Sequence, residues 1–320
     1  MRLLVSMGLR PLGRVDAPLA PRLVELDLTT GEVTRELGWE TPIEHRSDRA
    51  SDQEFTSAEW WAPGVLLQPT HTEVLWVDVR RWKVREVMSD PRFHGVHSAV
   101  PRPEGGLTVS AAGPQSVLEF DESHRCVAHH YLPESSFTDD FPDSADLRRA
   151  HHDAFKPHRF HPNQATHLSD GLWVTCLETH SVRRVDGTRE VGLGGMAHDG
   201  RLREGRVWFT RVDGRVIGLD PVTLSEEVHI DLQELLQTRR LLGWCRGVEV
   251  VGSRLFVGMS MLRSTRHREV LRWMMQGERG RKEPTRVIEI DLDSRQVVNT
   301  WVLGNRAGGT IYGLNALRMP

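Results

Sequence analysis

The sequence predicts an all-β fold, a six-bladed β-propeller, and two observations lead to this prediction. The first is a degenerate repeat of six short β-rich segments, each ending in an aspartate that precedes a turn: Asp27, Asp78, Asp121, Asp186, Asp220 and Asp291. The second is the character of the two ends. The closing segment IYGLNALRM has the pattern of an inner strand, and the opening segment RLLVSMG has the pattern of its neighbour. A shared sheet of this kind closes a ring and removes exposed sheet edges.

Each repeat contains four short strands, which we label A to D from the inside of the ring outward. Strand C ends at the aspartate, whose carboxylate can accept hydrogen bonds from backbone N–H groups of the following turn. Strand D follows that turn, and strands A and B precede strand C. Four short strands repeated six times are typical of a propeller, and the alternative, a two-sheet sandwich, fits six matching units less well.

The predicted blades account for the whole chain, 1–320, as a single domain. Blade 1 joins 310–318 to 2–37, and the next five blades are about 53–88, 94–132, 161–193, 195–230 and 244–303. Helical periodicity is scarce. The better helix candidates, all in predicted connections, are 145–154, 231–241 and 266–276.

The long connections are predicted to gather on one face of the ring. In an up-and-down blade, the B–C loops and the crossovers from strand D to the next strand A lie on the same face. That set contains the long segments, about 9–21, 38–53, 133–160, 231–243 and 263–284. Long loops on a rigid scaffold are usually functional. We therefore expect a lid over one mouth of the central channel, with unrelated surface loops as the alternative.

Bulk properties exclude several classes of protein. The net charge of −3 gives no overall attraction to nucleic acid, and no apolar run approaches the roughly 20 residues of a membrane span. Three scattered cysteines indicate neither a disulfide framework nor a zinc motif, so we expect a cytoplasmic protein. No phosphate-binding loop is present, so no nucleotide cofactor is expected. The oligomeric state stays open.

The starts of the inner strands are unusually polar, and they are predicted to line the lidded mouth of the channel. The side chains in question are Glu54, Glu59, His94, His97, His161, Asn163, His198, Arg246, Tyr312 and Asn315. Aligning the inner strands places Asn163, His198 and Arg246 at equivalent positions. The parity of blades 2 and 3 leaves open which glutamate, and which of His94 and His97, faces the channel.

Two chemistries fit these side chains. In the first, His94, His97, His161 and His198 supply ligands to a divalent metal, with Zn, Fe, Cu, Ni and Ca as candidates. In the second there is no metal, and a histidine acts as general acid or base. The catalytic candidates are then His198, Arg246, His161 and Tyr312. The candidate contacts to a small polar or anionic substrate are Asn163, Arg246, Arg263, Glu54 and Asn315.

We therefore expect an enzyme of the hydrolase, lyase, isomerase or cyclase type that acts on a small molecule. The alternative is a non-catalytic propeller that binds a protein or a glycan through the lid face. Metal content and substitutions at His198 and Arg246 would distinguish the two.

Two segments carry a resemblance to a known family. WCRGVEVVGSRLFVGMSMLR, residues 244–263, resembles the C-R-G…G-L-S-x-x-R signature of an uncharacterised bacterial family of six-bladed propellers, with Met259 in place of the usual leucine. HPNQATHLSDGLWVT, residues 161–175, is similar to the H-x-N segment of that family. The resemblance implies a propeller and points to His161, Asn163, Arg246 and Arg263. More distantly, the layout is similar to the superfamily of gluconolactonases and strictosidine synthases.

Overall fold

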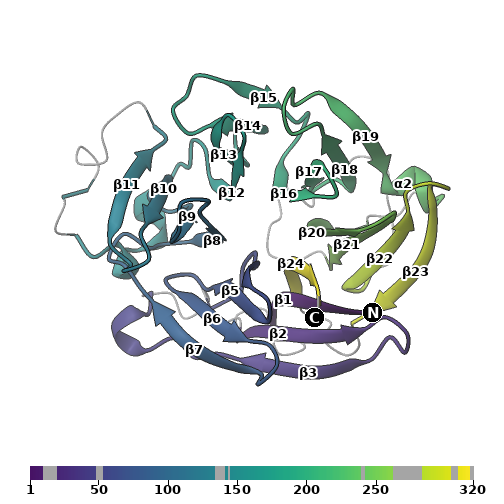
Figure 1. The fold of residues 1–320 in the computed structure, drawn as a ribbon, viewed down its shortest axis with the longest axis horizontal. Coiled ribbons are helices and arrows are strands. Elements are labelled where there is room, and N and C mark those ends of the chain that lie inside the picture. Colours follow the sequence, from purple (N-terminus) through teal and green to yellow (C-terminus); the bar gives the residue numbers. More distant parts are fainter. Residues whose placement is uncertain are drawn as a thin grey trace.

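Six antiparallel sheets of four strands each surround a central axis (Figure 1). The computed structural model describes residues 1–9, 20–47, 53–133, 141–142, 145–238, 242–261, 283–303 and 309–317. The predicted all-β fold with six blades is confirmed. The ring closes as expected, because the last strand of the chain pairs with the first: β24 is the inner strand of the sheet β24-β1-β2-β3.

The strand bounds agree with the predicted blades to within a few residues. Blade 1 consists of β24 (Thr310–Ala316), β1 (Arg2–Leu9), β2 (Ala20–Asp27) and β3 (Val33–Gly38). Blade 2 consists of β4 (Glu59–Ala62), β5 (Val65–Pro69), β6 (Val74–Asp78) and β7 (Lys83–Met88). Blade 3 consists of β8 (Val96–Pro101), β9 (Leu107–Ala111), β10 (Ser116–Phe120) and β11 (Cys126–Tyr131).

The second half of the ring follows the same order. Blade 4 consists of β12 (Pro162–Leu168), β13 (Gly171–Cys176), β14 (Ser181–Arg184) and β15 (Glu190–Gly192). Blade 5 consists of β16 (Ala197–Arg203), β17 (Arg206–Arg211), β18 (Arg215–Leu219) and β19 (Glu226–Asp231). Blade 6 consists of β20 (Trp244–Val251), β21 (Arg254–Ser260), β22 (Arg286–Asp291) and β23 (Gln296–Val302).

The six repeat aspartates do what the sequence predicts. Each accepts at least one backbone N–H from the turn between strands C and D. Asp27 accepts from Thr29 at 2.8 Å and Asp220 from Thr223 at 2.7 Å. The same bonds are made by Asp78, Asp121, Asp186 and Asp291. These backbone hydrogen bonds are the main reason that the pKa of every one of these carboxyl groups is lowered.

The core is divided among the interfaces between neighbouring blades. Six apolar clusters are present, one for each interface of the ring. Trp173 and Trp208, both fully buried, anchor the two interfaces on either side of blade 5. Because each blade is covered by apolar side chains on both faces, the strands bury their hydrophobic surface only when the ring is complete.

A polar side chain recurs at the same position of strand B in five blades. These residues are Ser6, Gln68, Ser110, Thr175 and Thr210, all buried. Several bind the neighbouring inner strand: Ser110 Oγ donates to Asn163 O at 2.8 Å, and Thr175 Oγ1 donates to Asp199 O at 2.6 Å. Blade 6 has Gly258 instead, because a Cβ there would lie 2.4 Å from Arg246 O.

The helices are shorter than predicted. The segment 145–154 forms two 3-10 turns, η2 (Leu147–Arg149) and η3 (His152–Phe155), because Ala150 between them is extended. The candidate 231–241 forms a single short helix, α2 (Leu232–Leu235), which Asp231 caps and which ends before Gln237, a residue with φ of 48°. The candidate 266–276 lies outside the described residues. A third 3-10 turn, η1 (Ile43–His45), precedes blade 2.

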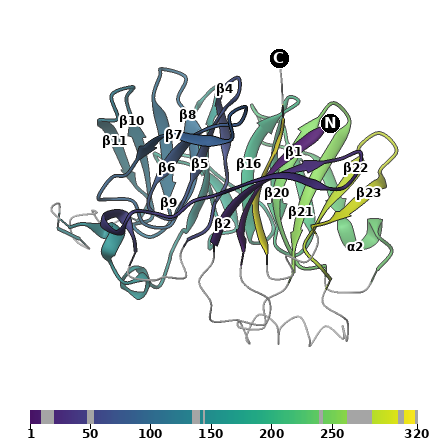
Figure 2. The ribbon, with the colours of Figure 1, turned by 90° about the horizontal axis from the view of Figure 1, so that it is seen from below.

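One face of the ring carries η1, η2, η3 and α2, together with the end of β1, the start of β2 and the end of β21 (Figure 2). It is the face at which the inner strands begin. The residues after Gly38 are fixed there by Glu73, which accepts from Trp39 Nε1 at 2.8 Å and contacts His45 Nδ1 at 2.9 Å. Parts of all five predicted lid segments lie outside the described residues, so the lid itself stays a prediction.

Candidate functional site at the channel mouth

A bulge interrupts the inner strand of most blades close to its start. The pairing of strand A with strand B skips His97 in blade 3, Asn163 in blade 4 and Tyr312 in blade 1, and it skips both Arg246 and Gly247 in blade 6. In blade 5 the bulge falls at Gly200. A bulge frees a residue from the ladder and re-aims its side chain, and such bulges are common beside active sites. Four of the candidate residues therefore stand at the same irregular step of the ring.

His97 and His161 form a pair between blades 3 and 4. Their Nε2 atoms are 3.0 Å apart, and the two rings meet edge to face. The ring of His158 lies 4.9 Å from that of His161 on its other side. Both members of the pair are half-buried. A 3.0 Å contact between imidazole nitrogens requires that one donates a proton to the other, so the pair shares a hydrogen bond.

His198 is a deeply buried candidate close to Arg246. It is 3% exposed, and neither ring nitrogen has a hydrogen-bond partner among the residues that the structure describes. Burial lowers the pKa of this imidazole well below 6.5, and the nearby charges of Arg246 and His161 lower it further. Burial, His161 and Arg246 act on His97 in the same direction. Both rings are therefore neutral at pH 7.

Arg246 supplies the positive charge of the mouth. Its guanidinium lies over the ring of Tyr312, with the carbon atom Cζ 4.4 Å from the ring centroid, so blades 6 and 1 meet at this contact. Arg246 is half-buried and Tyr312 is 7% exposed. Asn163, 3% exposed, donates its Nδ2 to Ala197 O, the residue before His198, at 3.1 Å. Its Oδ1 is buried and has no partner among the described residues.

Asp199 follows His198 and fixes the shape of the strand there. The residue has φ of 62°, and its Oδ2 accepts from Thr210 Oγ1 at 2.5 Å and from Gly247 N at 2.9 Å. These bonds join the bulges of blades 5 and 6 and so set where His198 and Arg246 stand relative to each other. Burial raises the pKa of this carboxyl.

His94 belongs to a second pair. Its Nε2 is 3.4 Å from Nε2 of His71, which lies in the B–C loop of blade 2, and Phe155 packs on its ring at 4.3 Å. His94 is fully buried. The structure separates the two histidines that the sequence left as alternatives, because His97 contacts His161 and His94 contacts His71. His71 was not among the predicted residues, although its place in a loop of the mouth face could have indicated it.

The predicted metal set is divided by this arrangement. Within the described part of the chain, no three side chains from His, Cys, Asp and Glu come together as a metal-binding group. The pairs His97–His161 and His71–His94 each offer two imidazoles, fewer than the three protein ligands of a catalytic zinc site. Metal binding therefore stays a prediction, and the described residues do not supply a complete set of ligands for it.

Asn315, Glu54 and Glu59 have other surroundings. Asn315 is fully buried, and its amide oxygen accepts from Arg201 at 2.5 Å further along the channel. Glu54 is half-buried before the first strand of blade 2, and Arg263 lies outside the described residues. Glu59, the other glutamate of blade 2, is held by Arg201 and Arg203 at 3.2 and 2.8 Å.

A buried ion-pair network joins inner strands of different blades, further along these strands than His198 and Arg246. Arg201, 1% exposed, reaches from blade 5 to Glu59 of blade 2 and to Glu249 of blade 6, and donates to backbone oxygens of Ala58, Val248 and Leu314. Arg203 also binds both glutamates. Burial by itself would raise the pKa of Glu59, but the two arginines lower it to about 2. We call Arg201, Arg203, Glu59 and Glu249 the axial ion cluster. Of these four residues, only Glu59 was among those predicted from the sequence.

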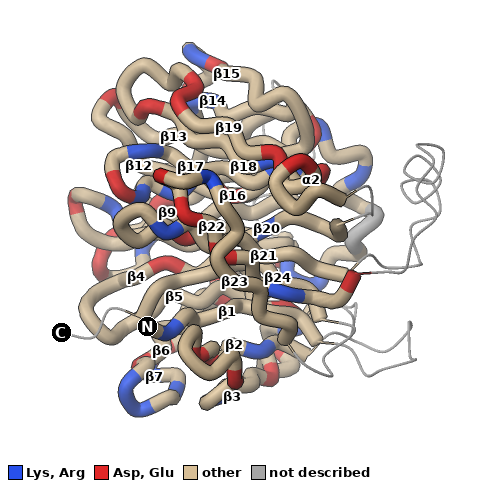
Figure 3. Tube along the Cα trace, turned by 90° about the vertical axis from the view of Figure 1, so that its right-hand side faces the viewer, with Lys and Arg blue, Asp and Glu red and all other residues tan. Residues whose placement is uncertain are grey.

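Basic and acidic residues are interspersed along the described part of the chain in the view of Figure 3. No helix among the described residues is both long and apolar enough to cross a membrane.

The fold and the site define this chain as a six-bladed β-propeller with a histidine-rich channel mouth. Among solved structures, it is similar to a protein of unknown function from Bacteroides caccae, with a TM-score of 0.65, 14% identity, and coverage of 98% of this chain and 97% of that chain. A streptogramin B lyase structure has a TM-score of 0.53 at 10% identity, over 95% of this chain and 90% of that one. A chain of a nidogen/laminin complex has a TM-score of 0.55 at 8% identity, over 98% and 97%.

These likenesses show the fold alone, because all three identities are low. No known family and no curated protein sequence matches the chain.

The buried His198 predicts a specific pH dependence of stability. Because its pKa is lower in the folded chain, the unfolded chain binds a proton below pH 6.5 that the folded chain does not bind. Stability therefore falls as the pH falls, by up to about 1.4 kcal/mol per pH unit from this group. Urea unfolding at pH 7.5 and 5.5 should show a smaller loss for His198→Gln than for the wild type. His229→Gln, an exposed histidine of the same blade, is the control. An equal loss in His198→Gln and the wild type would contradict the assignment.

Proposed function

We propose that the chain is an enzyme that acts on a small anionic molecule at the channel mouth, with His198 as general base or acid and Arg246 as the anion-binding residue. The observation that carries the proposal is the state of His198. It is buried, uncharged and without a hydrogen-bond partner among the described residues, and it stands near a guanidinium. A buried polar atom without a partner is uncommon in a purely structural role.

The chemistry follows from the charge states. A neutral imidazole has one nitrogen with a free lone pair, and it can take a proton from a substrate held within hydrogen-bond distance. A proton on His198 then lies near the charge of Arg246, which favours its return to the product or the leaving group. The His97–His161 pair, joined by one hydrogen bond, supplies a second donor and acceptor at the same mouth. Elimination, isomerisation, cyclisation and hydrolysis all need such a transfer.

The substrate class follows from Arg246 and Asn163. A guanidinium binds a carboxylate or phosphate through two parallel hydrogen bonds, and stacking on Tyr312 holds its plane. The unpaired Asn163 Oδ1 offers an acceptor to a hydroxyl or amide group. His198 and Arg246 lie near the starts of their inner strands, so the substrate would enter from the face at which the inner strands begin. These features fit a small polar anion.

One comparison helps to rank the reaction classes. The solved protein named streptogramin B lyase shows that a chain of this fold can be a lyase. We therefore place elimination first among the reactions to be tested.

Arg246→Gln tests the anion-binding role. Isothermal titration of the wild type with a panel of acetate, lactate, malate, citrate and inorganic phosphate should find at least one ligand, whose affinity falls about 10- to 100-fold in Arg246→Gln because a charged hydrogen bond is lost. Arg206→Gln, at an exposed ion pair of blade 5, should bind like the wild type.

Two results would overturn the proposal. One is a panel in which no anion binds. The other is equal binding by Arg246→Gln and the wild type. Recovery of a protein or glycan partner, with no ligand in the channel, would favour the non-catalytic alternative. Metal analysis of protein purified without chelator belongs to the same experiment. Stoichiometric metal that is lost in His161→Ala would replace the acid/base version with the metal-assisted one.

A further inference from the structure

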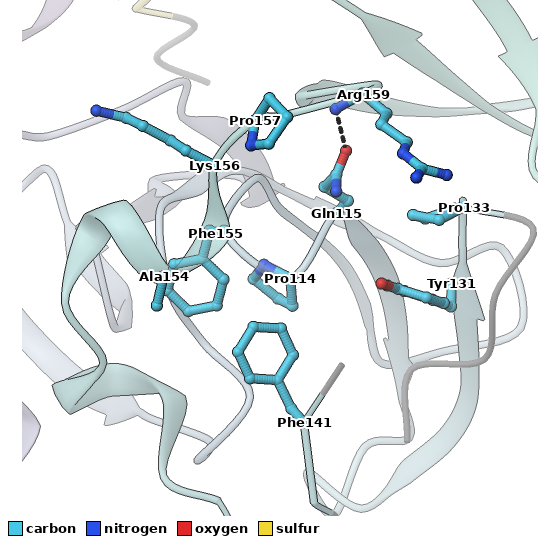
Figure 4. A pocket seen from close by; sticks show the side chains of 11 residues that line it. Pro114, Gln115, Tyr131, Pro133, Phe141, Ala154, Phe155, Lys156, Pro157 and Arg159 are labelled. Atoms are coloured by element: carbon cyan, nitrogen blue, oxygen red, sulfur yellow. Dashed lines mark hydrogen bonds between the residues drawn. The ribbon is translucent and has the colours of Figure 1, made fainter. Parts of the chain in front are cut away.

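A separate pocket of about 250 Å³ lies between blade 3 and the segment that enters blade 4 (Figure 4). Its walls come from the B–C loop of blade 3, the end of β11, Phe141, the end of η3 and the residues after it. The lining residues are Gly113, Pro114, Gln115, Tyr131, Pro133, Phe141, Ala154, Phe155, Lys156, Pro157 and Arg159. None of them belongs to the site proposed above.

Gln115 holds the two walls together. It is 9% exposed, its φ is 54°, and its Oε1 accepts from Arg159 N at 2.6 Å and from Phe160 N at 2.9 Å. The backbone of Gln115 also accepts from Leu132 N at 3.1 Å. Gln115 therefore binds two backbone segments, 159–160 through its side chain and Leu132 through its carbonyl oxygen, and these bonds hold the pocket walls together without a ligand. The pocket is therefore part of the folded structure and not a gap between independent loops.

One end of the pocket is aromatic. The rings of Phe141 and Phe155 lie 5.1 Å apart, and Pro114 faces them across the hollow (Figure 4). Phe155 is 5% exposed, so its position is set by packing. An apolar cavity of roughly 150 Å³ is enough to hold benzene. The volume of this pocket thus admits one aromatic ring with a short substituent.

The other end is cationic and able to form hydrogen bonds. The charged lining residues are Lys156 and Arg159, and no aspartate or glutamate is among the described residues that line the pocket. Figure 4 shows the guanidinium of Arg159 beside Pro133, on the same side as the hydroxyl of Tyr131, whereas Lys156 extends away. Within the described chain, the Arg159 guanidinium has no ion pair or hydrogen bond. A carboxylate would be its natural partner.

We propose that this pocket binds a small aromatic carboxylate, with the ring between Phe141, Phe155 and Pro114 and the carboxylate on Arg159. The proposal goes beyond the function proposed for the channel mouth and does not depend on it. Aromatic rings pack well in edge-to-face or offset arrangements with other rings, and a bidentate guanidinium fixes the orientation of the acid.

The pocket also has a physical connection to the mouth. Phe155 lines the pocket and packs on His94, whose Nε2 contacts that of His71. A ligand in contact with Phe155 would therefore be separated from the His71–His94 pair only by the ring of Phe155. Binding should change the NMR signals of these two imidazoles more than those of His229, which lies on the outer strand of blade 5.

Phenylacetate is the probe for the test. Saturation-transfer NMR and isothermal titration should show that the full-length wild type binds phenylacetate, while acetate, which lacks the ring, and benzyl alcohol, which lacks the charge, bind about 10-fold more weakly or not at all. Arg159→Gln should weaken phenylacetate binding about 10-fold. Arg149→Gln is the matched control, because Arg149 is an exposed arginine of the same entry segment that does not line the pocket.

Several outcomes would overturn the proposal. The first is no binding of phenylacetate at 10 mM, which is roughly the weakest affinity that is useful to measure. The second is equal binding of phenylacetate by Arg159→Gln and the wild type. The third is a loss of phenylacetate affinity in Arg149→Gln as large as that in Arg159→Gln. A loss of binding in Arg246→Gln with no change in Arg159→Gln would place the ligand at the channel mouth and would reject this pocket. If the channel mouth proves not to bind anions, the effect of Arg159→Gln on phenylacetate binding is still expected. The two proposals can therefore be rejected independently.

Discussion

His198→Gln is expected to lower turnover of the substrate found with the anion panel by about 10²- to 10⁴-fold, the usual contribution of a general acid or base. Glutamine fills a similar space and keeps one donor and one acceptor, but it does not take up a proton near neutral pH. Because His198 is buried and has no hydrogen-bond partner among the described residues, its replacement breaks no hydrogen bond to the described part of the chain. The loss should therefore appear in kcat more than in KM.

The control for this prediction is His229→Gln. His229 lies in the same blade and is exposed, where it contacts Glu226 at 3.1 Å. Its replacement should leave turnover within twofold of the wild type, a margin of about 0.4 kcal/mol. Far-UV circular dichroism and the urea midpoint must show that both variants are folded. Retention of more than about a tenth of the wild-type kcat by a folded His198→Gln would contradict the assignment of His198 as the catalytic acid or base.

Arg201→Met is expected to destabilise the protein by about 3–5 kcal/mol, the usual effect of removing one partner from a buried ion pair. Arg201 is 1% exposed and binds Glu59, Glu249 and Asn315 as well as backbone oxygens of three blades. Methionine would leave two buried carboxylates that share only Arg203. Urea unfolding, followed by the fluorescence of the buried tryptophans, measures the change.

Arg206→Met is the matched control for the axial ion cluster. Arg206 is the neighbouring arginine of blade 5, and its pair with Glu227 is 2.7 Å long but about 40% exposed on both sides. Such a pair contributes about 0–1 kcal/mol. If Arg201→Met proves too unstable to purify, Arg201→Lys keeps the charge but loses several hydrogen bonds and should fall between the other two. A loss of less than about 1 kcal/mol in Arg201→Met would contradict a stabilising role for the cluster.

The sequence predicted the blades well because each blade is built from residues that are close together in the sequence. The aspartate turn needs only a carboxylate and the next few backbone N–H groups, as at Asp27 and Thr29, so it can be recognised without knowledge of the rest of the fold. The predicted helices were less accurate. Leu147–Arg149 and Leu232–Leu235 form single turns, because extended or left-handed residues nearby end them, and apolar spacing alone does not show this.

The sequence indicated several polar residues near the channel mouth, but it did not indicate which of them meet. The face was inferred from strand order, and His97, Asn163, Arg246 and Tyr312 do stand at bulges close to it. The partners came from other blades. His94 meets His71, and Asn315 meets Arg201, across separations in sequence that no local pattern encodes.

By itself, the sequence determined the number of blades, the closure of the ring and the polar starts of the inner strands, because these depend on local turns and on alternation along a strand. Only the tertiary structure decided which of those polar groups meet. Inner strands from all six blades converge on one axis, and there the bulges and the burial of each side chain set its neighbours and its charge. That convergence leaves His198 neutral near Arg246 and gathers Arg201, Arg203, Glu59 and Glu249 into one cluster.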